Sequence, residues 1–303
     1  MTIADAGRSY GAHKIIMNVH VKDFNELISR ELNYPGCNNF HGTQLVLKAR
    51  DADVSGGKIR VGELDKLKDY PDIKSVTVFG LTQETFEYFV KTFGAQFRYI
   101  NFFKNKSVED WSLLGTLPEL EYVYWFHNQK ITKLWDMSKN LSLKAVELDD
   151  FTKLHDISGI EKAPSLEWFG IGNTMWRTLE LDSLKPLADT AVKRINFWGK
   201  CIRDMDISFL PDMKQLEVFD FPFNHFTTEQ VAWIVAKCPK LEGYSLRPYV
   251  EYKMFNEQTR QQDIPAAIIV GKRKPTIPFE GNEKKIEKYI SKFNELVEEY
   301  RKG

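Results

Sequence analysis

The sequence predicts an α/β solenoid, in which short parallel β-strands stack into a concave sheet and 3₁₀ or short α-helices line the convex side. Two observations support this fold class. One nine-residue pattern recurs eight times in the 303-residue chain, at intervals of 23–26 residues. The segments between the copies carry apolar residues at 3₁₀ or helical spacing. A chain that repeats one strand and one turn at a nearly constant period buries its core between neighbouring repeats.

The repeating pattern is LxxVxWxxN, as in LEYVYWFHN at Leu120–Asn128, and each copy has an apolar or aromatic residue at positions 1, 4 and 6. Positions 4 and 6 of a strand point to the same face, so they are expected in the core. The copies are IKSVTVFGL from Ile73, FRYINFFKN from Phe97, LEYVYWFHN from Leu120, LKAVELDDF from Leu143, LEWFGIGNT from Leu166, VKRINFWGK from Val192, LEVFDFPFN from Leu216 and LEGYSLRPY from Leu241.

This pattern resembles the leucine-rich repeat, LxxLxLxxN/C, with its period of about 20–29 residues. The resemblance covers Ile73 to about Tyr249 and is greatest to the short-repeat, internalin-like class. It implies a rigid solenoid with a parallel concave sheet and a role in protein–protein interaction. Aromatic residues often replace leucine, and position 9 is asparagine only at Asn105, Asn128 and Asn224. The repeats are therefore degenerate, and we expect an incomplete asparagine ladder.

The segments between the strands predict the convex side. Most have apolar residues every third position, which suits 3₁₀ turns; one such series is Val108, Trp111, Leu114 and Leu117. Two segments, Thr82–Phe93 and Thr227–Cys238, have a period nearer 3.6 and are expected to be α-helices. Thr227 and Gln230 form a predicted capping box at the start of the second helix.

The two ends are predicted to cap the solenoid, because terminal repeats need a polar outer side. Residues 1–72 form an N-terminal cap and an irregular first repeat, with strand-like segments at Ile15–Val21 and Thr43–Ala49. Residues 73–250 hold the repeats. Residues 251–303 form a C-terminal cap that ends in an amphipathic helix over 283–301.

Composition limits the classes of partner. Lysine plus arginine equals aspartate plus glutamate at 42 each, so the net charge gives no attraction to nucleic acid or to an acidic membrane surface. The three cysteines are widely spaced and predict reduced thiols rather than disulfides or a zinc site. The N-terminus has no secretory signal pattern and no apolar run is long enough to span a bilayer. We therefore expect a cytoplasmic protein.

The side chains at positions 3, 5 and 7 are expected on the concave face, opposite the core. Eight of these 24 positions are aromatic, whereas the whole chain is 13% aromatic, so the face is enriched more than twofold. Exposed aromatic surface commonly marks a binding site. The residues predicted to bind a protein or peptide are Phe79, Tyr99, Phe103, Tyr122, Tyr124, Phe126, Glu147, Asp149, Trp168, Arg194, Trp198 and Arg247.

Several other interpretations of this face remain open. The aromatic side chains would also suit a structural ladder between strands, or a surface that one of the chain's own ends covers. A self-complementary aromatic face would suit a homodimer. Aromatic platforms beside carboxylates also stack on sugars, so a carbohydrate-binding module that uses Trp168 and Trp198 is an alternative.

Catalytic and cofactor motifs are not found in the sequence. It holds no HExxH, GxSxG or P-loop pattern, and no GxGxxG after a strand. The acidic cluster of Glu147, Asp149 and Asp150 is the one candidate for an unrecognised enzyme. We expect no catalytic residues, no metal and no cofactor.

Overall fold

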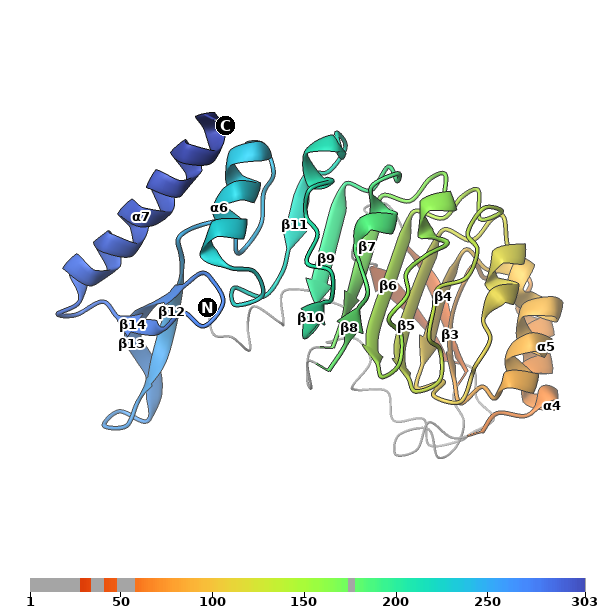
Figure 1. Ribbon diagram of the computed structural model, residues 1–303. Coiled ribbons are helices and arrows are strands. Elements are labelled where there is room, and N and C mark those ends of the chain that lie inside the picture. Colours follow the sequence, from red (N-terminus) through yellow and green to blue (C-terminus); the bar gives the residue numbers. More distant parts are fainter. Residues whose placement is uncertain (1–27, 34–40, 48–57, 174–177, 303) are drawn as a thin grey trace.

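The computed structural model describes residues 28–33, 41–47, 58–173 and 178–302, which form a curved solenoid (Figure 1). In the described part of the chain, the main sheet has nine strands in the order β1-β2-β3-β4-β5-β6-β7-β9-β11. Strand β1 is antiparallel to β2, and the later neighbours are parallel. The strands are β1 (Ile28–Asn33), β2 (His41–Leu47), β3 (Ser75–Phe79), β4 (Tyr99–Phe103), β5 (Tyr122–Asn128), β6 (Ala145–Phe151), β7 (Trp168–Gly172), β9 (Arg194–Trp198) and β11 (Val218–Asp220).

The predicted leucine-rich-repeat solenoid is confirmed. Strands β3, β4, β5, β6, β7, β9 and β11 start two residues after position 1 of the first seven copies of the pattern. Their register aligns equal positions, so that Tyr99 pairs with Tyr122 and Tyr122 with Ala145. Strand β2 lies within the expected N-terminal cap and adds a further parallel strand beside β3.

The eighth copy, from Leu241, is not a strand, and this prediction is wrong. Only an isolated bridge joins Glu242 to Val218, and the chain then turns. The Asp220 Oδ1 accepts from the backbone N–H of Tyr244 at 2.8 Å, and the Ser245 hydroxyl donates to the Phe221 carbonyl at 2.7 Å. These side chains satisfy backbone groups that a further strand would have paired.

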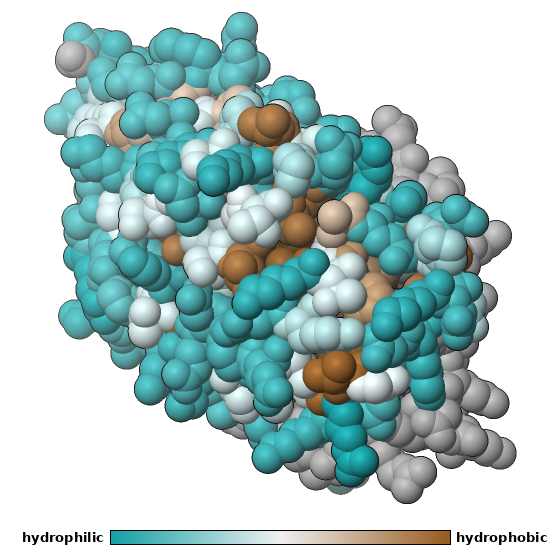
Figure 2. Space-filling model, turned by 90° about the vertical axis from the view of Figure 1, so that its right-hand side faces the viewer, coloured by the Kyte–Doolittle hydropathy of each residue, from teal (hydrophilic) through white to brown (hydrophobic). Residues whose placement is uncertain are grey.

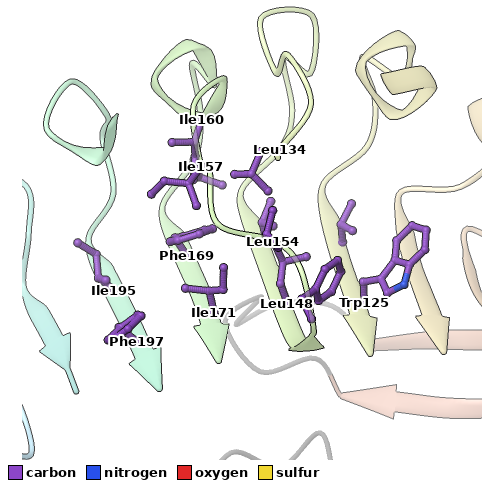
Figure 3. Close-up of a cluster of buried hydrophobic side chains, with 14 of the residues drawn as sticks. Trp125, Leu134, Leu148, Leu154, Ile157, Ile160, Phe169, Ile171, Ile195 and Phe197 are labelled. Carbon is purple, nitrogen blue, oxygen red and sulfur yellow. The ribbon is translucent and has the colours of Figure 1, made fainter. Parts of the chain in front are cut away.

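The core lies between the parallel sheet and the convex turns. Positions 4 and 6 of the strands are buried there, including Trp125, Leu148, Phe169 and Phe197. Figure 3 shows side chains from the turns, such as Ile157, above these strand residues. The 3₁₀ turns are η1 (Asp65–Asp69), η2 (Gly94–Gln96), η3 (Ser112–Thr116), η4 (Ile160–Lys162), η5 (Lys185–Leu187) and η6 (Leu210–Asp212). A two-residue parallel ribbon, β8 (Glu180–Leu181) with β10 (Cys201–Ile202), joins two of the repeats.

Two of the three predicted ladder asparagines satisfy backbone groups between repeats. Asn128 donates to the carbonyls of Asn105 and Val108 at 3.0 and 2.9 Å and accepts from two amides of its own turn. Asn105 bonds the backbone of the repeat before it at 2.7 and 2.9 Å. Asn224 is exposed instead, because the chain after β11 leaves the regular repeat. Sequence reasoning missed Asn140, which is buried and joins neighbouring turns in the same way.

The two predicted α-helices are present as α5 (Gln83–Phe93) and α6 (Thr228–Lys237). The capping box at the start of α6 is confirmed, with Gln230 N–H donating to the Thr227 hydroxyl at 3.2 Å. A similar box at Thr82 begins α5.

The described part of the N-terminal region includes α4 (Val61–Leu64), and Figure 2 shows the end of the solenoid that carries α4 and α5. That end is mostly hydrophilic, with small hydrophobic patches, as expected for a cap. The predicted strand at Ile15–Val21 lies outside the described residues.

At the other end, β12 (Tyr249–Asn256), β13 (Gln261–Ile269) and β14 (Thr276–Pro278) form an antiparallel sheet. The predicted amphipathic helix is α7 (Glu283–Lys302), which lies beside α6 (Figure 1) and buries Phe293 and Val297 in the main core. The division of the chain at residues 72 and 250 stays a prediction.

Candidate functional site

The parallel register gathers nearly all of the predicted binding residues on the concave face of the sheet. Position 3 gives one row across the strands, from Tyr99 through Tyr122, Ala145 and Trp168 to Arg194. Position 7 gives a second row, which includes Phe79, Phe103, Phe126, Asp149 and Trp198. Arg247 is the exception: it is exposed in the turns that replace the eighth strand.

Three tyrosines of this face are buried, which contradicts the expectation of an exposed aromatic platform at these positions. Tyr99, Tyr122 and Tyr124 are 7%, 1% and 5% exposed, and they pack in one cluster with Ala145. The Tyr99 hydroxyl donates to Glu121 at 2.9 Å, and the Tyr122 hydroxyl donates to Glu147. Neighbouring rungs lie only about 4.8 Å apart, so large rings in register cover one another. These three side chains therefore pack against one another, and Tyr99 and Tyr122 also bond acidic side chains.

Other aromatic side chains of the face remain partly open to solvent. Phe103 and Phe126 are half-buried and stack at 4.7 Å with an interplanar angle of 25°. Trp198 is half-buried at the end of β9. Trp168 is also half-buried, and the Arg194 guanidinium lies 4.9 Å from its ring centroid. We call these four half-buried rings, Phe103, Phe126, Trp168 and Trp198, the rim.

Glu147 occupies the middle of the sheet, opposite Tyr124 on β5 and Gly170 on β7. Burial raises the pKa of Glu147 to about 7; the hydrogen bond from Tyr122 opposes this rise, and the negative charge of Asp149 adds to it. Among the described residues, no lysine, arginine or histidine forms an ion pair with Glu147. The carboxylate is thus held in a low-polarity setting with hydrogen bonding but without a counter-charge.

Two glycines on β7 let the neighbouring side chains approach the strand. A methyl group placed on Gly170 would lie 3.2 Å from Cγ of Glu147, 3.5 Å from Nε1 of Trp168 and 3.8 Å from Cβ of Asn196. A methyl group on Gly172 would lie 2.8 Å from Cβ of Trp198. We call the group formed by Tyr122, Tyr124, Glu147, Trp168 and Asn196 the Glu147 centre.

A row of polar atoms at position 5 crosses the Glu147 centre. Thr77 Oγ1, Asn101 Oδ1, Tyr124 OH and Asn196 Oδ1 are all buried and have no hydrogen-bond partner within the described part of the chain. Their residues are at most 6% exposed. Buried polar atoms are nearly always hydrogen-bonded in proteins, so a row of such atoms on one face is unusual. Burial also raises the pKa of Tyr124 well above its usual value, as do the charges of Asp149, Glu147 and Asp150.

A second polar column, which sequence reasoning missed, lies where the strands end. Position 8 has a positive φ of 56° at Lys104, 64° at His127 and 60° at Asp150. His127 Nδ1 lies 2.6 Å from Asp150 Oδ2, and Asn173 donates to the other Asp150 oxygen at 2.9 Å. The sequence feature that could have indicated this column is Gly80, which occupies position 8 of the first copy and also has a positive φ, of 73°. Asp150 is therefore partnered within the strand-end column.

The described residues contain no group of three or more histidine, cysteine, aspartate or glutamate side chains arranged to hold a metal ion. Within the same ranges, no helix has the length and apolar content needed to cross a membrane.

Known proteins resemble this chain at the level of the fold. No protein-family model matches the chain, and no curated protein matches its sequence. Among solved structures, the chain is similar to an internalin (inlF) from Listeria monocytogenes, with a TM-score of 0.46 and 14% sequence identity. The alignment covers 69% of this chain and 59% of the internalin chain, so this chain spans less than two thirds of that protein. The likeness concerns the fold alone.

Proposed function

We propose that this protein is a non-enzymatic interaction scaffold that binds a protein or peptide segment on the concave face of its sheet. The observation that carries the proposal is the row of buried, unpartnered polar atoms at position 5, flanked by half-buried aromatic rings. Such atoms would gain hydrogen bonds from a bound chain, whose backbone offers one donor and one acceptor per residue.

The burial pattern favours different roles for the predicted aromatic residues. Tyr99, Tyr122 and Tyr124 hold the sheet together and fix the position of Glu147. The half-buried rings at Phe103, Phe126, Trp168 and Trp198 supply apolar contact area to a partner. Because the strands fix these rings in place, binding would lose little side-chain entropy.

The test compares two variants in a binding experiment. Phe103→Ser/Phe126→Ser removes the stacked pair at the rim, whereas Leu141→Ser removes a side chain that is 60% exposed in the turn before β6. Both variants are first checked for folding by circular dichroism. We expect wild type and Leu141→Ser to retain the same partner in pull-downs from native lysate, and the rim variant to lose it. A folded rim variant that keeps the partner contradicts the proposal.

Carbohydrate binding is the second candidate, and the placement of two tryptophans favours it. Trp168 and Trp198 are half-buried beside Gly170 and Gly172, with Glu147 and Asn196 as neighbouring acceptors. Sugars commonly need this combination of ring faces and polar groups. Glycan binding predicts a weak affinity that salt does not change and that Trp198→Ala abolishes. A glycan array followed by titration at low and high salt separates this candidate from protein binding.

A further inference from the structure

We propose that the Glu147 centre receives a positively charged side chain of the partner, either a lysine ammonium or an arginine guanidinium. This inference rests on the proposed function and names the chemistry of the residue that the scaffold recognises. Four features of the centre support it: an uncompensated carboxylate, the surrounding rings, the neighbouring acceptors and the negative charge close by.

The uncompensated carboxylate is the first feature. Glu147 is half-buried, accepts from the Tyr122 hydroxyl and makes no ion pair with any residue in the described ranges. A buried carboxylate without a cation is unfavourable, and a cationic group at hydrogen-bond distance would compensate its negative charge. Arg194 does not serve this purpose, because its guanidinium lies over the ring of Trp168.

The rings around the carboxylate are the second feature. Tyr124 pairs with Glu147 across β5 and β6, and Trp168 reaches over Gly170 on the other side. Aromatic faces attract ammonium and guanidinium groups, and this attraction is stronger where water is excluded. A carboxylate between aromatic side chains therefore suits a cation better than a neutral polar group.

The unpartnered atoms beside Glu147 are the third feature. Asn196 Oδ1 accepts hydrogen bonds and lies on the strand after Gly170, while Asn101 Oδ1 accepts on the strand before Tyr124. A lysine carries three N–H donors and an arginine five, with no acceptor on either head group. The Trp198 indole N–H is also unpartnered among the described residues and is a donor. It would suit a backbone carbonyl of the same partner segment.

The charge around the centre is the fourth feature. Tyr122 and Tyr124 face Glu147 from β5, Asp149 lies two residues along β6, and Trp168 and Asn196 approach from β7 and β9. The negative charge of Asp149 adds to that of Glu147, while the guanidinium of Arg194 lies over the ring of Trp168. The two carboxylates would attract a cation of the partner and repel an acidic or phosphorylated residue.

The experiment measures binding of short probe peptides to the intact protein by isothermal titration calorimetry at pH 8. The probes are acetylated and amidated Gly-Gly-X-Gly-Gly peptides in which X is lysine, arginine, norleucine or glutamate. Titrations continue to millimolar concentration because one side chain contributes limited affinity. We expect the lysine or the arginine probe to bind at least about tenfold more tightly than the norleucine probe, and the glutamate probe to bind most weakly. The tighter of the two basic probes identifies which head group the centre takes.

Two variants and one control decide whether Glu147 is responsible. Glu147→Gln removes the charge and keeps an oxygen for Tyr122, and Gly170→Ala crowds the Glu147 side chain. Glu299→Gln removes an equal charge at an exposed position of α7. We expect both site variants to lose the preference for basic probes, and Glu299→Gln to keep it. Circular dichroism first tests whether each variant is folded, and only folded variants are compared.

Three results would overturn the inference. Equal binding of the norleucine and basic probes, or no binding of either basic probe, means that the centre does not select a cation. A preference that survives in folded Glu147→Gln places the selectivity elsewhere. If rim variants still abolish capture of a protein partner while the basic probes fail, the inference is wrong and the proposed function stands.

Discussion

The replacement of Glu147 by glutamine should stabilise the protein at alkaline pH and have a smaller effect at acidic pH. The pKa of Glu147 rises from 4.5 to about 7, mainly because of burial. The folded state therefore holds a proton that the unfolded chain has released over this interval. Stability falls as the pH rises from about 4.5 to about 7 and is then constant, because the carboxylate must ionise in the folded protein.

The size of this effect follows from the pKa difference. Each pH unit corresponds to about 1.4 kcal/mol, so the full interval corresponds to about 3 kcal/mol. About 2.5 kcal/mol of this loss falls between pH 5 and pH 8. Because Glu147 is half-buried, solvent reduces the effect, and we expect about 1–2.5 kcal/mol. Glu147→Gln has no carboxylate to ionise and so does not lose this stability. The free energy of unfolding of Glu147→Gln minus that of wild type should therefore increase by about 1–2.5 kcal/mol from pH 5 to pH 8.

Urea denaturation at pH 5 and pH 8, without any ligand, measures this difference. Glu299→Gln serves as the control, because its exposed carboxylate on α7 should change stability by less than about 0.5 kcal/mol at either pH. If the difference between Glu147→Gln and wild type is the same at both pH values, the carboxylate is not held in an unfavourable setting. The argument for an uncompensated charge would then fail.

Further predictions concern the repeats and the N-terminal region, and they are checked by urea denaturation of single variants. Asn128→Ala should lower the free energy of unfolding by about 2–4 kcal/mol, since the buried asparagine makes four hydrogen bonds to backbone groups. Asn224→Ala, at an exposed position, should change it by less than about 0.5 kcal/mol. Equal losses in the two variants would refute the asparagine ladder. Gly159→Ala should lower it by at least about 2 kcal/mol, because Gly159 has a φ of 102° and a methyl group there would lie 2.4 Å from a backbone oxygen. Gly62→Ala, with nothing within 4 Å, should be neutral or stabilising, and a loss there would contradict this account. Thr227→Ala should cost about 1 kcal/mol through loss of the α6 cap, and an unchanged midpoint would mean that the cap contributes nothing.

The fold was largely predictable because one physical pattern recurs along the chain. Positions 4 and 6 are apolar in every copy, and the structure buries them in one core in the first seven copies. The eighth copy has the same apolar positions, yet Leu241 begins a series of turns instead of a strand. There, Asp220 and Ser245 bond the backbone directly. The pattern of apolar residues does not predict that polar side chains will take the backbone hydrogen bonds that a strand would otherwise form.

The candidate site was predicted in its location but not in its burial. Alternation placed Tyr122 and Glu147 on the concave face, and the structure agrees. The alternation of side chains along a strand predicts which face of the sheet a side chain lies on. Its exposure to solvent depends instead on the side chains that pack beside it in neighbouring repeats. The partnership between His127 and Asp150 was missed for a related reason, since it depends on a left-handed backbone position that is occupied by glycine in the first copy but by histidine and aspartate in the third and fourth.

The most direct test of the concave face as the binding surface is site-specific photocrosslinking in the cell that makes the protein. A benzophenone amino acid replaces Phe126 at the half-buried rim, and in a second version it replaces Leu141 in the exposed turn before β6. We predict a crosslink to another protein from position 126 and no such crosslink from position 141. A crosslink from position 126 only to the chain itself, or crosslinks to a partner only from position 141, would contradict the account.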